Sequence, residues 1–162
     1  MVTAGDSNTS LHVCRFRGRS EHILDGKGRI NIPSRFRDVL MRHYDDRLLI
    51  TPPWRKCLRV YPLSEWEKKE KALLSLDKQK PKIDMMIRYL VGGSVECQLD
   101  KNGRILIPAK HRTDIGLQNE IIMNGMITFF EVWPKETWDS ESYPSEQDFI
   151  DFDETFRDLG MF

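Results

Sequence analysis

The chain is poor in cysteine and has no long apolar run. Its three cysteines, Cys14, Cys57 and Cys97, are scattered and odd in number, so the close pairs typical of a zinc site or a disulfide framework are missing. This usage favours a reducing compartment. No segment approaches the roughly 20 consecutive apolar residues of a membrane-spanning helix, and residues 1–13 lack the basic start and apolar run of a secretion signal. The sequence therefore predicts a soluble, cytoplasmic protein with no membrane partner.

The net charge is zero, because 25 Lys and Arg residues balance 25 Asp and Glu residues. A zero balance argues against a generic polyanion binder. The charges are nevertheless divided along the chain: residues 1–90 hold 19 basic against 11 acidic residues, whereas residues 91–162 hold 6 against 14. A basic half followed by an acidic tail indicates nucleic-acid contact. The alternative is a solvated surface whose two halves differ in composition.

What the chain does contain is an internal repeat. Residues 24–33 (LDGKGRINIP) and 99–108 (LDKNGRILIP) are one motif written twice, 75 residues apart. A Val-aromatic-Pro motif also recurs, at 60–62 and 132–134, where the offset has fallen to 72. The loss of three residues is what a shortened surface loop produces. The chain is therefore a tandem duplication, long enough for one domain or for two small halves that share a core.

Each copy predicts a strand, a tight turn, a second strand and a short helix. Gly28 and Gly103 supply the positive φ that the turns need. In the first copy Ile30 and Ile32 alternate with a polar residue, so both isoleucines face one side of the strand. Pro33 then ends the strand and pre-sets φ for a helix.

The second part of each copy predicts a hairpin, at 48–61 and at 121–133. Ser64 and Glu67 form a capping-box pair that would open a helix after the first hairpin. Residues 83–91 predict a helix that links the two copies. Past residue 138 no periodicity is evident, which indicates disorder or a marginal helix. The expected divisions are a disordered N-terminal extension at 1–13, a first repeat with its following helix at 14–80, a second repeat with a linking helix at 81–138, and an acidic C-terminal tail at 139–162.

These motifs, in this order, resemble the bacterial MraZ family. The resemblance covers about residues 14–140 and rests on Phe16-Arg17-Gly18, on 24–33 with Phe36-Arg37, on Tyr61-Pro62 with Trp66, and on the second copies at 99–108 and 130–133. It implies a mainly β fold with short helices (α+β), in which tandem, pseudo-symmetric AbrB-like swapped-hairpin halves form a small β-barrel. Family chains begin near the position of Phe16, so residues 1–13 look like an extension.

The resemblance also implies a function. Family members are described as DNA-binding regulators of the division and cell-wall gene cluster, which bind direct repeats in double-stranded DNA upstream of their own gene. They form ring-shaped homo-oligomers. Subunits arranged head to tail in a ring present their DNA-contacting elements in the same orientation, which matches a target made of direct repeats. We therefore expect a nucleoid-associated protein that is no enzyme and needs no cofactor, metal or small-molecule substrate.

The Gly-Arg turn suits nucleic acid, because glycine permits close approach and arginine offers a planar fork for phosphate or for guanine O6 and N7. Arg17 and Arg15 would flank the first turn if the first strand pairs as expected. The second turn carries Asn102 in place of Lys27, which makes it a weaker candidate. The candidate DNA-binding residues are Arg29, Lys27, Arg17, Arg15 and Arg104.

Several alternatives remain open from sequence. The turn arginines could instead pair with Asp25 or Asp100, and Arg37, like Arg35, is expected on a helix surface or at a subunit interface. The chain could also be a protein-interaction scaffold whose acidic tail recruits partners, in which case the basic half would have no role in DNA binding. Gly93-Ser94 is a dipeptide at which self-processing barrel enzymes cleave, although a simple turn is the plainer interpretation and no nucleophile, base and orienter set accompanies it.

Overall fold

The computed structural model describes residues 15–77 and 79–161. The predicted extension at 1–13 lies outside the described residues. The first copy contains β1 (Arg19–Ile23), β2 (Arg29–Asn31), α2 (Ser34–His43), β3 (Arg47–Ile50), β4 (Leu58–Pro62) and α3 (Leu63–Leu74). After the linking helix α4 (Pro81–Leu90), the second copy contains β5 (Val95–Gln98), β6 (Arg104–Leu106), α5 (Ala109–Ile115), β7 (Glu120–Gly125), β8 (Phe130–Pro134) and α6 (Lys135–Glu141), and α7 (Glu146–Asp158) follows. The repeat seen in sequence is thus a repeat of elements.

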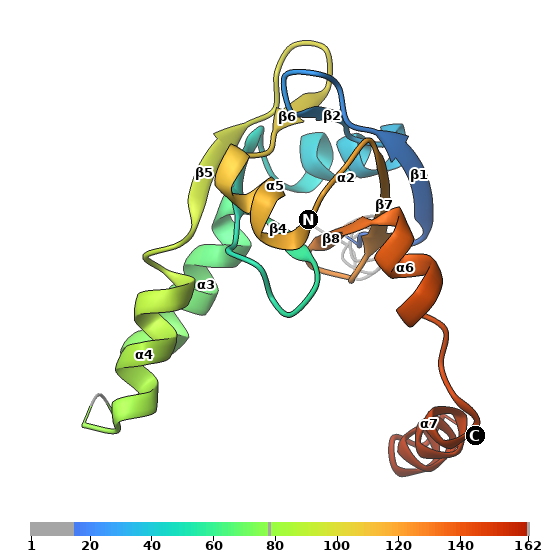
Figure 1. Cartoon of the computed structure of the whole chain (residues 1–162). Helices are drawn as coiled ribbons and strands as arrows, with labels where there is room; N and C mark the ends of the chain where they lie inside the picture. The colour runs from blue at the N-terminus through green and yellow to red at the C-terminus, as the bar shows by residue number, and fades with distance from the viewer. Residues whose placement is uncertain (1–14, 78, 162) are drawn as a thin grey trace, which may run out of the picture.

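The two copies exchange strands. A six-stranded antiparallel sheet has the order β1-β7-β8-β4-β3-β5, in which the first strand of each copy pairs with the third strand of the other. The fourth strands, β4 and β8, pair at the centre. The second strands, β2 and β6, pair only with each other in a separate two-stranded sheet. The expected α+β class is confirmed, but the expectation of a mainly β fold is wrong, because the helices of the described residues, up to 13 residues long, hold more of the chain than the strands of three to six residues (Figure 1).

The expected closed barrel is not seen in the part of the chain that the structure describes. β1 and β5 are the two edges of the six-stranded sheet and do not pair with one another. Closure fails because each edge strand turns out of the sheet at its end, at Asp25 or Asp100, and continues into β2 or β6. β2 and β6 form the separate two-stranded sheet at one end of the molecule (Figure 1).

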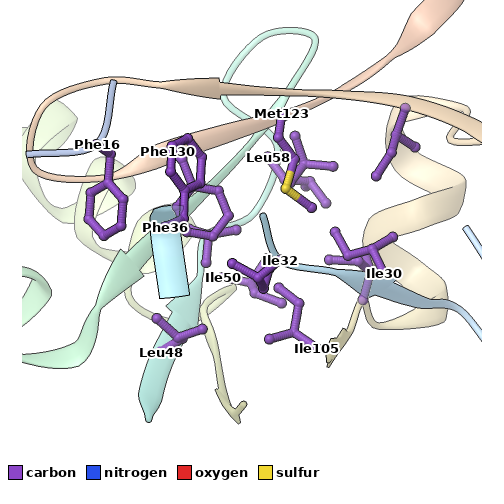
Figure 2. Close-up of a cluster of buried hydrophobic side chains, with 14 of the residues drawn as sticks. Phe16, Ile30, Ile32, Phe36, Leu48, Ile50, Leu58, Ile105, Met123 and Phe130 are labelled. Carbon is purple, nitrogen blue, oxygen red and sulfur yellow. The ribbon is translucent and has the colours of Figure 1, made fainter. Parts of the chain in front are cut away.

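The core lies between this two-stranded sheet, α2 and the six-stranded sheet. Ile30 and Ile32 are almost fully buried whereas the intervening Asn31 is exposed, so the alternation predicted from sequence is confirmed. Phe36 of α2 packs on Phe130, with 5.2 Å between ring centroids, and on Phe16 at 5.3 Å (Figure 2). Each such side chain contributes about 1.5–3 kcal/mol on burial. One core shared by both copies therefore stabilises the molecule, and Leu48, Ile50 and Phe130 belong to it. Leu49 points to a second buried cluster that also contains Tyr61, Leu63 and Trp66.

Prolines begin the helices that follow strands. Pro33, Pro62 and Pro108 are the N-cap residues of α2, α3 and α5. The predicted capping box at Ser64 is wrong, because α3 already starts at residue 63 and Ser64 lies inside its first turn. A capping box is present instead at α7, where the Ser145 hydroxyl accepts from the backbone N–H of the third helical residue.

The segment after residue 138 is helical, which is one of the two alternatives that the sequence leaves open. It completes α6 and then forms the 13-residue helix α7, so the disordered alternative is wrong for the described residues. Burial inside this chain does not explain α7, because none of its residues is buried. The sequence does carry a helical signal, since Phe149, Phe152 and Phe156 recur at spacings of three and four residues. The cap and the acidic first turn of α7 stabilise its start. None of the helices in the described ranges is long and apolar enough to cross a membrane.

Candidate nucleic-acid interface

The first repeated turn is organised by the carboxylate of Asp25. Its Oδ1 accepts hydrogen bonds from the backbone N–H groups of Lys27 and Arg29, both at 2.9 Å. Its Oδ2 accepts from Nε of Arg29 at 2.7 Å. The backbone N–H of Arg29, followed by its guanidinium, lowers the pKa of Asp25 from 3.8 to about 2. Asp25 therefore fixes both the turn and the direction of the Arg29 side chain.

The second turn repeats this arrangement. Oδ1 of Asp100 accepts from the backbone N–H groups of Asn102 at 2.8 Å and Arg104 at 2.9 Å, and Oδ2 accepts from Nε of Arg104 at 3.0 Å. The backbone N–H of Arg104 is the largest cause of the lowered pKa of Asp100. The ion pairs considered as an alternative from sequence are thus present in both turns.

These ion pairs engage Nε of each arginine and leave part of the side chain exposed. Arginine carries five N–H donors, and the side-chain hydrogen bond that Arg29 and Arg104 make uses only Nε. Their side chains keep 31% and 26% of their exposure. Lys27 and Lys101 are exposed at the tips of the turns. Each turn therefore presents an oriented arginine beside an exposed lysine.

Pairing of β2 with β6 places the two turns at one end of the molecule. Ile30 lies opposite Ile105 in this antiparallel ladder. The ladder continues into the turns, since the Ile32 N–H donates to Gly103 O and the Ile107 N–H donates to Gly28 O, both at 2.9 Å. Figure 1 shows the two loops side by side beyond the β2 and β6 labels. A single chain thus carries two basic turns related by an approximate two-fold axis.

Two further arginines support the turns, each from the opposite copy. A methyl group built on Gly28 would lie 2.7 Å from Cζ of Arg112, which comes from α5. One built on Gly103 would lie 2.7 Å from Cδ and Nη1 of Arg37, which comes from α2. Nε of both arginines is buried and finds no hydrogen-bond partner among the described residues. Each guanidinium thus packs against a glycine of the other copy and brings positive charge beneath its turn.

Sequence reasoning placed Arg37 on a helix surface or at a subunit interface and assigned Arg112 nothing. The signal was present, because Arg37 and Arg112 obey the same offset of 75 as the turns. We name the resulting surface the twin-turn surface: residues 25–29 and 100–104 with Arg37 and Arg112. Its six basic side chains outnumber its two carboxylates.

Arg15 and Arg17 do not flank the first turn, contrary to expectation. β1 lies between them and the turn, and Phe16 forms a bridge to Ile127 near the opposite end of β1. They line a groove along α2 together with Arg35 and Arg42. The expectation failed because it assumed that the segment before β1 stays beside the turn, whereas β1 pairs along β7 and carries that segment away.

The comparisons with known proteins agree with the duplicated architecture. The family model described as "MraZ protein, putative antitoxin-like" matches residues 15–88 and 90–158. This chain belongs to the MraZ family. It is 43% identical over 125 residues to the Transcriptional regulator MraZ of Syntrophobacter fumaroxidans, covering 77% of this chain and 83% of the relative. It is 39% identical over 146 residues to the Transcriptional regulator MraZ of Pediococcus pentosaceus, covering 90% and 99%.

The MraZ match extends further along the chain than the sequence motifs do. The motifs end near residue 140, whereas the family match runs to residue 158 and so includes α7. The acidic C-terminal helix is therefore part of the region that this chain shares with the MraZ family.

The Gly93-Ser94 dipeptide of this MraZ-family chain forms a turn at the end of α4. The Gly93 N–H donates to Tyr89 O at 3.2 Å, and the Ser94 hydroxyl donates to Leu90 O. Both groups satisfy carbonyls of the last helical turn.

Among the described residues, no group of three or more His, Cys, Asp or Glu side chains is placed to hold a metal ion. The relatives carry the name of a regulator rather than of an enzyme.

Proposed function

We propose that this protein is a sequence-specific, DNA-binding transcriptional regulator that contacts double-stranded DNA through the twin-turn surface. The observation that carries the proposal is the pair of identical Asp-anchored arginines, Arg29 and Arg104, held at one end of the molecule. The names of the curated relatives support a role in transcription. No catalytic role is part of this proposal.

The chemistry of the turns fits a nucleic acid. Asp25 holds Nε of Arg29, so the two Nη groups can donate together to guanine O6 and N7 or to two phosphate oxygens. Lys27 and Lys101 supply mobile charges for phosphate. Arg15 and Arg17 act separately, as phosphate contacts in the groove along α2. Arg104 repeats the role of Arg29 on the adjoining stretch of DNA.

The finer features of the proposal come from the family resemblance. We place the chain among AbrB-like swapped-hairpin proteins, and the exchange of β1 and β5 between copies supports this. We further propose a nucleoid-associated, ring-shaped homo-oligomer that binds direct repeats upstream of its own gene and regulates the division and cell-wall cluster. Subunits arranged head to tail present their turns in one sense, and linked weak sites gain occupancy through effective concentration.

A binding measurement tests the proposal. Purified protein is titrated onto DNA from upstream of its own gene and onto a scrambled fragment of equal length, at two salt concentrations. We expect preferential binding that weakens steeply with salt, because several phosphates are neutralised. Arg29→Ala should lower the affinity roughly 5- to 150-fold, since one bidentate base contact is worth about 1–3 kcal/mol. Lys56→Ala, which also removes an exposed cation paired with a carboxylate, should bind like the parent.

Equal binding to both fragments, or none, would instead favour the protein-interaction scaffold. The exposed apolar side chains of α7 are the observation that favours this second candidate. An oligomer that dissociates on Arg29→Ala would also contradict a direct DNA contact, because it would make Arg29 an interface residue.

A further inference from the structure

The second buried cluster lies on the face of the six-stranded sheet that points away from the main core. Side chains alternate between the two faces of a strand, so Leu58 and Val132 belong to the main core whereas Tyr61 and Phe129 face the other way. Tyr61 stacks on Phe129 with 4.6 Å between ring centroids, and Trp66 of α3 packs on Tyr61 at 5.3 Å. This outer face is therefore rich in aromatic rings.

A pocket of about 340 Å³ opens beside these rings. Most of its wall is aromatic or aliphatic and consists of Trp54, Tyr61, Trp66, Leu73, Leu90 and Phe129. Two cations, Arg59 and Lys69, also line it. Pockets of this size, with an apolar wall and a few placed polar groups, are typical of sites for small organic molecules. We refer to it as the Arg59 pocket.

Arg59 lies close to two aromatic rings. Its Cζ is 5.0 Å from the ring centroid of Phe129 and 5.3 Å from that of Trp54, distances at which a guanidinium interacts with a ring face. Its Nε is buried and finds no hydrogen-bond partner among the described residues. Burial raises the pKa of Tyr61, and a hydrogen bond from Arg59 opposes that rise. Aromatic rings and a neutral hydroxyl therefore surround the guanidinium, and neither carries a compensating charge.

The carboxylate opposite Arg59 in the sheet is engaged by other donors. Glu131 lies opposite Arg59 in the β4–β8 ladder. Its Oε1 accepts from Nε1 of Trp133 at 3.1 Å and from Nδ2 of Asn124 at 3.3 Å. Its Oε2 accepts from Sγ of Cys57 at 3.5 Å. Within residues 15–77 and 79–161, no ion pair joins Glu131 to Arg59.

The tandem duplication provides an internal comparison for this pocket. At the offset of 72 residues, the pocket residues Arg59, Tyr61, Trp66 and Lys69 correspond to Glu131, Trp133, Trp138 and Glu141. Both aromatic positions of the first copy remain aromatic in the second. Both cations, in contrast, are carboxylates there, so the two equivalent places carry opposite charge.

The second copy satisfies its equivalent groups with residues of the same chain. Cζ of Arg19 lies 4.5 Å from the ring centroid of Trp138, and Lys56 forms an ion pair with Glu141. Hydrogen bonds occupy both carboxylate oxygens of Glu131. The two cations of the first copy, in contrast, have no ion-pair partner in the described part of the chain. A partly buried positive charge beside aromatic rings is thus available to a ligand.

We propose that the Arg59 pocket binds a small aromatic carboxylate. The ring of the ligand packs among Trp54, Trp66 and Phe129, since aromatic rings favour stacked and edge contacts with one another. Its carboxylate accepts hydrogen bonds from Arg59, whose single charge matches a monoanion. Lys69 adds positive charge at the exposed rim. This inference goes beyond the proposed function and depends on neither DNA binding nor an oligomer.

Fluorine NMR of the full chain labelled with 5-fluorotryptophan tests the proposal. Two of the four tryptophans, Trp54 and Trp66, line the pocket, whereas Trp133 and Trp138 belong to the second copy. Single Trp→Phe variants assign the four resonances. Titration with indole-3-acetate should shift the resonances of Trp54 and Trp66 and leave the other two in place. We expect a dissociation constant of about 1 mM or tighter, the affinity of a ligand of this size at ordinary ligand efficiency.

Two related probes separate the ring from the charge. Indole-3-acetamide keeps the ring but is neutral, and acetate keeps the charge but has no ring. Both should bind at least about tenfold more weakly than indole-3-acetate, because each lacks one of the two contacts. An amide that binds as tightly as the acid would overturn the proposal. Shifts confined to Trp133 and Trp138, or no shift at about 10 mM indole-3-acetate, would overturn it as well.

Variants of single residues test the assigned contacts. Arg59→Met removes the charge but keeps most of the apolar stem, and it should weaken binding about tenfold or more. Arg19→Met is the matched control, because Arg19 also lies over a tryptophan ring but outside the pocket, so this variant should bind like the parent. Trp54 is 39% exposed on a surface turn, and Trp54→Ala should also weaken binding.

Unchanged circular dichroism and thermal midpoints establish that these variants are folded. If Arg59→Met does not fold, Trp54→Ala decides the outcome. Parent-like affinity in the folded pocket variants would contradict the proposal. All titrations are made without DNA, so a failure of the DNA-binding proposal leaves their outcome unchanged.

Discussion

Gly28 of the first copy packs directly against the guanidinium of Arg112 from the second copy. The backbone of Gly28 has φ of 85°, and a methyl group at its Cα would come within 2.7 Å of the Arg112 Cζ. The reciprocal relationship joins Gly103 to Arg37. Each DNA-facing turn of the proposal is therefore shaped by two requirements, a left-handed backbone and a flat surface for an arginine from the other copy.

Gly28→Ala should destabilise the fold by about 1–2 kcal/mol, because alanine resists a left-handed backbone and its methyl group displaces the Arg112 guanidinium. Gly26→Ala is the matched control in the same turn, since a methyl group there meets nothing within 4 Å. Urea unfolding of both variants measures the difference. Equal midpoints would contradict the packing described here.

Asp25→Asn should destabilise the protein in a pH-dependent manner. The folded pKa of Asp25 is lowered to about 2 from 3.8, so its contribution is present above pH 3.8 and is lost as the pH falls toward 2. The free energy of unfolding of the parent should therefore exceed that of the variant at pH 6, and this gap should shrink at pH 3. A gap that is the same at both pH values would rule out the carboxylate as its source.

Arg112→Met should weaken DNA binding several-fold while changing the free energy of unfolding by less than about 1 kcal/mol. Methionine keeps most of the apolar stem but removes the charge beneath the first turn, and the buried Nε loses no hydrogen bond because it makes none within the described residues. Filter binding and urea unfolding give the two readouts. Arg157→Met, which removes an arginine from α7, serves as the control and should bind one DNA repeat like the parent.

Cys57 and Cys97 should be inert to thiol reagents in the folded protein. Burial raises the pKa of each thiol to about 12, so almost no thiolate exists at pH 8. In a Cys14→Ser background, Ellman's reagent should react with neither thiol on the timescale on which the urea-unfolded protein releases two equivalents. Rapid reaction of the folded protein would show that one of these sites opens readily.

Local features of this chain were predictable from sequence. The glycine turns, the alternation of Ile30 and Ile32, and the helix at 83–91 follow from residue type and period, and the structure confirms them. These properties depend on neighbours within a few residues, where backbone sterics and hydrophobic patterning dominate. The repeat itself was readable for the same reason, because each copy encodes its own elements.

Pairings between distant residues were decided by tertiary structure alone. Which copy each edge strand joins, where Arg15 and Arg17 lie, and which glycine Arg37 and Arg112 support depend on contacts across about 45–110 residues. Two identical sets of strands satisfy the same local rules whether each copy pairs with itself or with the other. Only burial of one shared core selects the exchange, and with it the twin-turn surface.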